Sequence, residues 1–249
     1  MDLENKYGTL EIQRATIELL KSFSSFAKEH NICYSLVDGS MLGAVRHHGF
    51  IPWDDDVDII VSREIFNKLI NSDLSNEDFC IFRDLWLARI QFKNNSDSDT
   101  IPTIDVLVLD KAPSNPILRK IKLLLVYMMQ GMMKKELNFD KGGLLMKACL
   151  IVTRIMGLPF SYKTKYRWYG KLSTLWGNEN YSQCYNTIFE YIPIFFDGDV
   201  MDHLLEVPFE DMTQPIMNKY DHWLTRRFGD YMTPPKMEDR VPRHNNRKE

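Results

Sequence analysis

Residues 37–62 read VDGSMLGAVRHHGFIPWDDDVDIIVS, and the fold of the rest of the chain follows from this stretch. An apolar segment ends at residues 38–40 (DGS), and a short helical pattern then leads into a loop broken by glycine and proline. Trp53 closes that loop, and the apolar, strand-like run 57–61 begins shortly after it. Four aspartates stand at this junction within five residues: Asp54, Asp55, Asp56 and Asp58.

Strand alternation predicts how these carboxylates are arranged. Successive side chains on a strand point to opposite faces, so Asp56 and Asp58 should share one face while Val57 and Ile59 enter the core. Clustered carboxylates beside a buried strand repel one another and lose hydration, and both effects raise the free energy of the folded protein. A divalent cation bound between the carboxylates removes that cost. Hard oxygen ligands suit Mg²⁺ or Mn²⁺. The pattern therefore favours a metal site over a solvated acidic loop or a set of helix caps.

The loop on either side of Trp53 supplies further candidates. Extending the alternation backwards places Asp54 near the metal site and Asp55 pointing away from it. Gly39 and Ser40 open a helical pattern, where free backbone N–H groups and a hydroxyl suit a phosphate, although such turns also occur for turn chemistry alone. Arg46 lies on that helix and either clamps a phosphate or forms a surface ion pair.

Asp105 is an isolated acid in the apolar run 101–109 (IPTIDVLVL), which has the pattern of a buried strand. A carboxylate in such a place needs a partner. One interpretation is a buried salt bridge with a residue such as Arg89. The other is a third metal ligand or general base beside Asp56 and Asp58, and the acidic pair upstream favours this second interpretation.

The composition is that of an ordinary globular protein, with 249 residues, 44% hydrophobic and 26% charged. A net charge of -3 argues against a nucleic-acid partner. The four cysteines are far apart in the sequence, which is typical of thiols in a reducing compartment. The N-terminus has no secretory pattern, and no apolar run reaches the length of a membrane span. We therefore expect a cytoplasmic protein.

Hydrophobic periodicity predicts an α+β fold. The apolar segments 117–137 and 144–158 carry scattered Lys and Arg, and they are either helices of a packed helical region or an interfacial pair in peripheral contact with the inner face of the cell membrane. Expected helices are 10–30, 41–47, 63–71, 117–137, 144–158, 162–175 and 217–228, and expected strands or extended segments are 32–37, 57–61, 79–82, 86–93, 101–109 and 188–196.

Residues 39–46 (GSMLGAVR) and 49–58 (GFIPWDDDVD) resemble the signature of the LicD/fukutin family, and segments 101–110 and 207–244 resemble its later motifs. This family contains phosphotransferases, including bacterial phosphocholine transferases, within the nucleotidyltransferase-fold superfamily. The superfamily pattern is Gly-Ser, then Asp-x-Asp on a strand, then a third carboxylate on a later strand. The resemblance implies a nucleotidyltransferase-like mixed β-sheet flanked by helices, with an added helical region.

The resemblance also implies an organisation and an activity. Residues 1–111 would form the catalytic core, 112–185 a helical insertion facing the acceptor or a membrane, and 186–249 a segment that returns to complete the core. The expected reaction moves a phosphocholine-type group from a CDP-choline-like donor to a sugar hydroxyl of a cell-surface glycan or lipid-linked saccharide. Two alternatives stay open: a nucleotidyltransferase that releases pyrophosphate, and a non-catalytic partner in glycan assembly.

Each candidate residue has an implied role in that reaction. Asp56, Asp58 and Asp105 would bind Mg²⁺ or Mn²⁺ and act in catalysis, with Asp105 also accepting the proton of the acceptor hydroxyl. The remaining candidates would contact the substrate: Gly39, Ser40, Arg46, Trp53 and Asp54.

Overall fold

The computed structural model describes residues 6–71, 78–94, 101–135, 144–184, 194–198 and 200–242. The chain divides into two compact units. Unit 1 consists of residues 1–83, 87–108 and 200–249, and unit 2 consists of residues 84–86 and 109–199. The division after residue 108 lies close to the predicted boundary after 111, and the division after 199 lies beyond the predicted boundary after 185.

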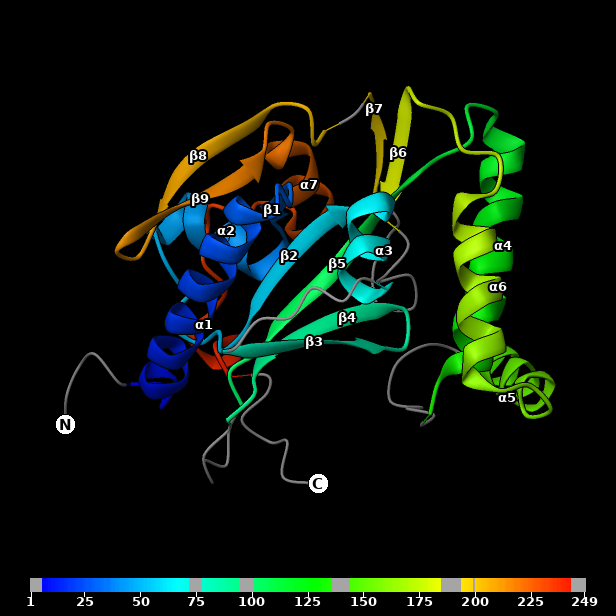
Figure 1. Ribbon diagram of the computed structural model, residues 1–249, viewed down its shortest axis with the longest axis horizontal. Coiled ribbons are helices and arrows are strands. Elements are labelled where there is room, and N and C mark those ends of the chain that lie inside the picture. The colour runs from blue at the N-terminus through cyan, green and yellow to red at the C-terminus, as the bar shows by residue number, and fades with distance from the viewer. Residues whose placement is uncertain are drawn as a thin grey trace. The chain divides into compact units, whose positions relative to one another are not determined.

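A mixed β-sheet forms the centre of unit 1 (Figure 1). Its strands follow the order β3-β4-β5-β2-β1-β9-β8, in which β1 pairs antiparallel with β2 and parallel with β9. The predicted α+β class, with a mixed sheet flanked by helices, is confirmed. The strands are β1 (Tyr34–Leu36), β2 (Val57–Ser62), β3 (Phe79–Asp84), β4 (Leu87–Phe92), β5 (Ile104–Lys111), β8 (Leu204–Phe209) and β9 (Met212–Met217).

Helix α1 (Leu10–Glu29) packs an apolar stripe into the core of unit 1. Its buried residues recur with helical spacing, and Phe23 lies at their centre with no exposed surface. The Phe23 ring meets those of Phe26, Tyr34 and Phe79 at centroid distances of 6.4, 5.2 and 6.3 Å. The other helices of unit 1 are α2 (Asp38–His47), α3 (Arg63–Asn71), α7 (Tyr220–Phe228) and the 3-10 turn η2 (Met237–Asp239).

Replacing Phe23 by alanine tests this core. Phe23→Ala is expected to lower the free energy of unfolding by about 3–5 kcal/mol, because a ring with no exposed surface leaves a cavity. Phe82→Ala on β3 is the matched control, since that ring is 38% exposed and should cost much less. Urea unfolding of both variants measures the difference, and equal losses would contradict this account of the core.

Strand β5 passes from unit 1 into unit 2 after residue 108. Residues 109–111 of β5 pair antiparallel with β6 (Tyr181–Cys184), and β6 pairs with β7 (Phe195–Asp197). The expected extended segment 188–196 lies largely outside the described residues, which resume at residue 194. The helices of unit 2 are α4 (Pro116–Met133), α5 (Leu144–Gly157) and α6 (Tyr162–Thr174).

Helix α4 packs against both α5 and α6 (Figure 1). The core between α4 and α6 is built from Val126, Met129, Met133 and Tyr169, all buried. Two glycines permit close approach of α4 and α5, because a Cβ on Gly131 would clash with Thr153 and one on Gly157 with the backbone of Met132. None of the described helices is both long and apolar enough to cross a membrane.

Candidate active site

Asp56, Asp58 and Asp105 converge in unit 1. One carboxylate oxygen from each lies within 4.8 Å of the other two. Asp56 directly precedes β2, Asp58 is the second residue of β2, and Asp105 is on the adjacent strand β5. Val57 and Ile59, between and after the two β2 acids, are fully buried. The structure therefore shows the predicted alternation on β2 and brings the acid of β5 to the same place.

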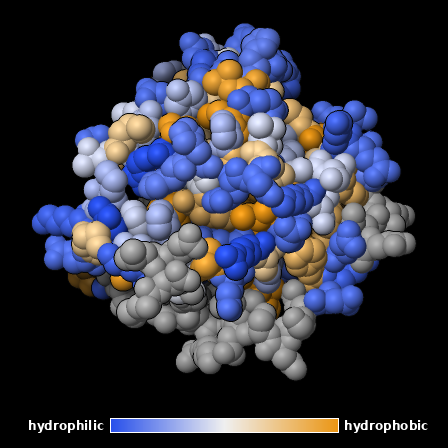
Figure 2. All heavy atoms as spheres, turned by 90° about the vertical axis from the view of Figure 1, so that its left-hand side faces the viewer, coloured by the Kyte–Doolittle hydropathy of each residue, from blue (hydrophilic) through white to orange (hydrophobic). Residues whose placement is uncertain are grey.

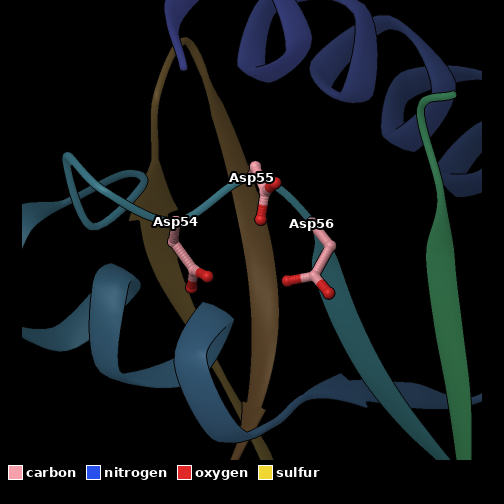
Figure 3. A group of neighbouring side chains, drawn as sticks. All are labelled: Asp54, Asp55 and Asp56. Atoms are coloured by element: carbon pink, nitrogen blue, oxygen red, sulfur yellow. The ribbon is translucent and has the colours of Figure 1, made fainter. Parts of the chain in front are cut away.

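A second group joins the first through Asp56. Asp54, Asp55 and Asp56 also place one carboxylate oxygen each within 4.8 Å of the others (Figure 3). This second group includes neither Asp58 nor Asp105, so the expectation that Asp55 points away from the site stays a prediction. These three residues lie before β2 begins at Val57, so the strand alternation used for the prediction does not extend to them. Asp55 is only 6% exposed, and it takes part in a chain of neighbouring acids.

The environment of Asp58 disfavours its ionised form. Burial raises the pKa of Asp58 well above its usual value, and the nearby carboxylates of Asp56, Asp38, Asp105 and Asp54 raise it further, in that order. A cation placed among these groups would relieve both effects, because it replaces lost hydration and screens the repulsion. The site is thus electrostatically suited to a divalent metal ion.

Asp105 forms the ion pair of the first interpretation and lies where the second requires it, while its part as a metal ligand or general base stays a prediction. Its Oδ1 atom accepts a hydrogen bond from Nε of Arg89 at 2.9 Å, and the two residues face each other across the β4–β5 ladder. It also belongs to the group with Asp56 and Asp58. Arg89 therefore supplies one positive charge to a cluster of acids and fixes the orientation of the Asp105 carboxylate.

The start of α2 is attached to β2 at Asp58. The Asp58 backbone N–H donates to the Ser40 hydroxyl at 2.8 Å, and the Asp58 carbonyl accepts from the Val37 N–H at 3.0 Å. Ser40 is buried, so this contact gives it a structural part in positioning Asp58; its binding of phosphate stays a prediction. Gly39 leaves room for Asp54, since a Cβ at Gly39 would meet the Asp54 carboxylate.

Asp38 was not singled out from sequence, yet it joins the start of α2 to the C-terminal helix α7. Its Oδ1 accepts hydrogen bonds from Nε1 of Trp223 at 2.8 Å and from Nε of Arg227 at 2.7 Å, and Oδ2 accepts from Nη2 of Arg227 at 3.1 Å. The ion pair is almost fully buried, and Asp38 has a positive φ of 49°. An acid within an apolar segment, the feature that pointed to Asp105, also marks Asp38 in the printed sequence.

Arg46 lies in a positively charged region beside the acids. Its Nη1 atom donates to the carbonyl oxygen of Tyr231 at 2.6 Å, which ties α2 to the C-terminal segment. Burial lowers the pKa of Arg46, and the nearby Arg240 lowers it further. The pKa of His47 is lowered by burial and then by Arg46 and Arg240. Among the described residues, no carboxylate forms an ion pair with either guanidinium.

Trp53 connects this positive region to the acidic group. The Arg240 guanidinium lies over the Trp53 ring at 5.2 Å from its centroid, and His47 meets the same ring edge-on at 6.4 Å. Asp54 is the next residue along the chain. Arg240 was missed as a separate candidate because nothing in the local sequence links position 240 to position 53. The two regions together offer both a cation site and an anion site.

The chain is similar in sequence to known proteins. Residues 31–141 match the family described as LicD/FKTN/FKRP, nucleotidyltransferase domain. The chain is 23% identical over 263 residues to the lipopolysaccharide cholinephosphotransferase LicD of Haemophilus influenzae, covering 94% of this chain and 95% of that protein. An uncharacterized protein of Rickettsia prowazekii is 45% identical over 47 residues, which are 19% of this chain and 18% of that protein.

The mixed sheet and its converging acids thus occur in a chain that resembles, along nearly its whole length, a transferase of phosphorus-containing groups. Residues 31–141 are similar to the nucleotidyltransferase domain of the LicD family, and the whole chain is similar to one LicD protein.

The crowding of the acids gives a stability prediction. Asp58→Asn is expected to raise the melting temperature of the metal-free protein by about 2–6 °C, because it removes a carboxylate whose ionised form is disfavoured by burial and by its neighbours. Asp202→Asn, at an exposed position, is the control. Thermal unfolding in excess chelator measures both variants, and a lower melting temperature for Asp58→Asn would count against the electrostatic argument.

The buried ion pair of Asp38 gives a second prediction. Asp38→Asn should lower the free energy of unfolding by about 3 kcal/mol, because the Arg227 guanidinium stays buried without its anion. Asparagine tolerates positive φ, so the substitution isolates the loss of charge. Asp211→Asn removes only the exposed pair with Lys21 and should leave the unfolding midpoint nearly unchanged. Equal midpoints for both variants in urea would disprove the structural role of Asp38.

Proposed function

We propose that this protein is a metal-dependent phosphotransferase that moves a phosphocholine-type group from a CDP-linked donor to a sugar hydroxyl of lipopolysaccharide or a similar cell-surface glycan. The observation that carries the proposal is the convergence of Asp56, Asp58 and Asp105 from two adjacent strands. The similarity to a lipopolysaccharide cholinephosphotransferase along nearly the whole chain supports the choice of group and acceptor.

The residues present fit a divalent cation. Three carboxylate oxygens within 4.8 Å of one another provide hard ligands. Burial and then the neighbouring acids raise the pKa of Asp58, although Arg89 places a positive charge at Asp105. Asp56, Asp58 and Asp105 would hold Mg²⁺ or Mn²⁺. When bound, such an ion stabilises negative charge on the diphosphate oxygens of the donor.

The positive region would hold the donor phosphates. The first turn of α2 presents backbone N–H groups that no preceding carbonyl within the helix satisfies, and it lies next to the acidic group at Asp54. Arg46 is held in place by the Tyr231 carbonyl, and the planar guanidinium suits phosphate oxygens. The donor would therefore be bound through its diphosphate, with Trp53 and Arg240 at the edge of this region.

In the transfer step, the acceptor hydroxyl oxygen forms a bond to the phosphorus of the choline phosphate while the bond to the bridging oxygen of CMP breaks. CMP leaves with the electron pair of that bond, and the hydroxyl proton passes to a carboxylate oxygen of Asp105. Arg89 orients the Asp105 carboxylate for this purpose. Most of the rate enhancement would come from positioning and from charge stabilisation, so no nucleophilic Ser or Cys is required.

The same carboxylates could serve nucleotidyl transfer, which the family's domain description makes the second candidate. In that reaction, a nucleoside triphosphate is attacked at its α-phosphorus and pyrophosphate leaves. The identity of the released product separates the two reactions: CMP supports phosphocholine transfer, and pyrophosphate supports nucleotidyl transfer.

A direct assay tests the proposal. The purified protein with Mg²⁺, CDP-choline and lipopolysaccharide is expected to release CMP and to increase the mass of the glycan by one phosphocholine group. Asp56→Asn, Asp58→Asn and Asp105→Asn should each lower turnover by at least about a hundredfold, because each removes a charged ligand. Asp202→Asn should retain wild-type turnover. Full activity of any of the three site variants, or undiminished activity in excess EDTA, would rule the mechanism out.

Metal binding can be measured without turnover. Mg²⁺ or Mn²⁺ at millimolar concentration is expected to raise the melting temperature of the wild-type protein, since an ion that binds only the folded state stabilises it. The same addition should have little effect on Asp58→Asn. If both proteins respond equally, the ion binds elsewhere and the site assignment is wrong.

A further inference from the structure

The outward face of α5 is apolar. Ile151, Val152, Ile155 and Met156 lie on that face, at the i, i+1, i+4 and i+5 positions of the helix, and all are exposed. The next segment continues the pattern with Leu158. A helix on the surface of a globular protein normally presents polar residues to solvent and apolar residues to the core. Helix α5 buries Leu150 but leaves these four apolar side chains exposed.

Packing inside unit 2 fixes this orientation. Thr153 of α5 lies against Gly131 of α4, and Gly157 lies against the backbone of Met132, so both contacts require close approach of the two helices. Thr153 and Arg154 are half-buried, whereas Ile155 beside them is 60% exposed. Helix α5 cannot rotate its apolar face inward without losing these contacts.

Helix α4 and the loop after α5 add to the exposed apolar surface. Ile117, Ile121 and Leu124 are spaced by four and three residues along α4, so they share one face. Large exposed apolar surfaces on a protein usually mark a site of interaction with a membrane or another protein. The exposed large apolar residues between positions 117 and 160, each at least 40% exposed, are Ile117, Ile121, Leu124, Leu144, Ile151, Val152, Ile155, Met156, Leu158 and Phe160.

The charge of the same helices indicates which partner they fit. Residues 112–135 and 144–178 contain 11 Lys and Arg and no Asp or Glu. The rest of the chain carries 20 Lys and Arg (31 less 11) against all 34 Asp and Glu. The basic residues are Arg119, Lys120, Lys122, Lys134, Lys135, Lys147, Arg154, Lys163, Lys165, Arg167 and Lys171. Lys122 and Lys165 are buried and Lys135 pairs with Asp84, so the charge that can meet a partner comes from the other basic residues.

We propose that the outward faces of α4 and α5, with the exposed lysines and arginine of α6, bind the surface of an anionic phospholipid membrane. The apolar side chains would enter the boundary between headgroups and acyl chains, and the Lys and Arg side chains would contact lipid phosphates. A second copy of this chain fits less well, because it would bring two acid-free, positively charged surfaces together.

Other parts of the structure agree with this partner. Tyr166 and Trp168 of α6 are partly buried against the core between α4 and α6, and the Trp168 ring also packs edge-on against the exposed Phe160 at 4.7 Å. Amphipathic aromatic rings are enriched at membrane interfaces. By contrast, the side of unit 1 that bears β8 is mostly hydrophilic, with apolar side chains in small groups (Figure 2). Docking of α4 and α5 on lipid would bring a transferase close to a lipid-anchored acceptor, although the docking does not depend on turnover.

Vesicle flotation tests the proposal. The full-length protein is expected to float with vesicles of phosphatidylcholine containing phosphatidylglycerol, to float much less with phosphatidylcholine alone, and to be released at high salt. Ile151→Glu/Ile155→Glu should lower the partition coefficient by at least about tenfold, because charges replace two inserted side chains. Leu205→Glu, 43% exposed on β8, is the matched control and should bind like wild type.

A charge-reversal variant measures how much electrostatic attraction to the lipid contributes to vesicle binding. Lys163→Glu/Lys171→Glu on α6 should also lower binding to the anionic vesicles, whereas Lys28→Glu on α1 should not. Unchanged melting temperatures will show that the variants are folded. The proposal is overturned if wild type does not float with anionic vesicles, or if both double variants float as well as wild type. It is also overturned if sedimentation shows a dimer that Ile151→Glu/Ile155→Glu converts to a monomer while vesicle binding is unchanged.

Discussion

Mutual repulsion among dehydrated carboxylates is the constraint on which the architecture of unit 1 depends. Asp56, Asp58 and Asp105 are held within a few ångströms by two adjacent strands, against a tendency to separate that grows with burial. Such an arrangement persists only where surrounding contacts are strong. The Ser40 and Val37 hydrogen bonds at Asp58, and the Arg89 ion pair at Asp105, are contacts of this kind.

Supporting contacts also extend across the chain. Asp38 at the start of α2 is held by Trp223 and Arg227 of α7, and Arg46 at the end of α2 is held by the Tyr231 carbonyl. Both ends of this short helix are thus fixed by the last part of the chain. The helix in turn sets the positions of Gly39 and Ser40 against the acids. The positions of the acids therefore depend on contacts throughout unit 1.

The sequence predicted those features that depend on local periodicity. The alternation on β2 placed Asp56, Asp58 and their buried neighbours correctly, because a strand has a strict period of two. The same alternation does not fix the position of Asp55, because that residue precedes the strand. The pairing of Asp38 with Arg227 could not be predicted, since 189 residues separate the partners and neither sequence context specifies the other. Likewise, the sequence predicted apolar helices in the middle of the chain. It could not predict which face of α5 is exposed, because that depends on the glycine contacts between α4 and α5.

The anchoring of Asp38 has a consequence for how the domain can be divided. The stretch that matches the family's nucleotidyltransferase domain, 31–141, includes Asp38 and the acids but excludes α7. A fragment with those ends would contain a buried carboxylate lacking its guanidinium and indole partners, as well as a sheet without β8 and β9. That stretch is therefore a unit of sequence similarity, whereas the contacts that hold α2 beside the acids extend to Arg227 and Tyr231.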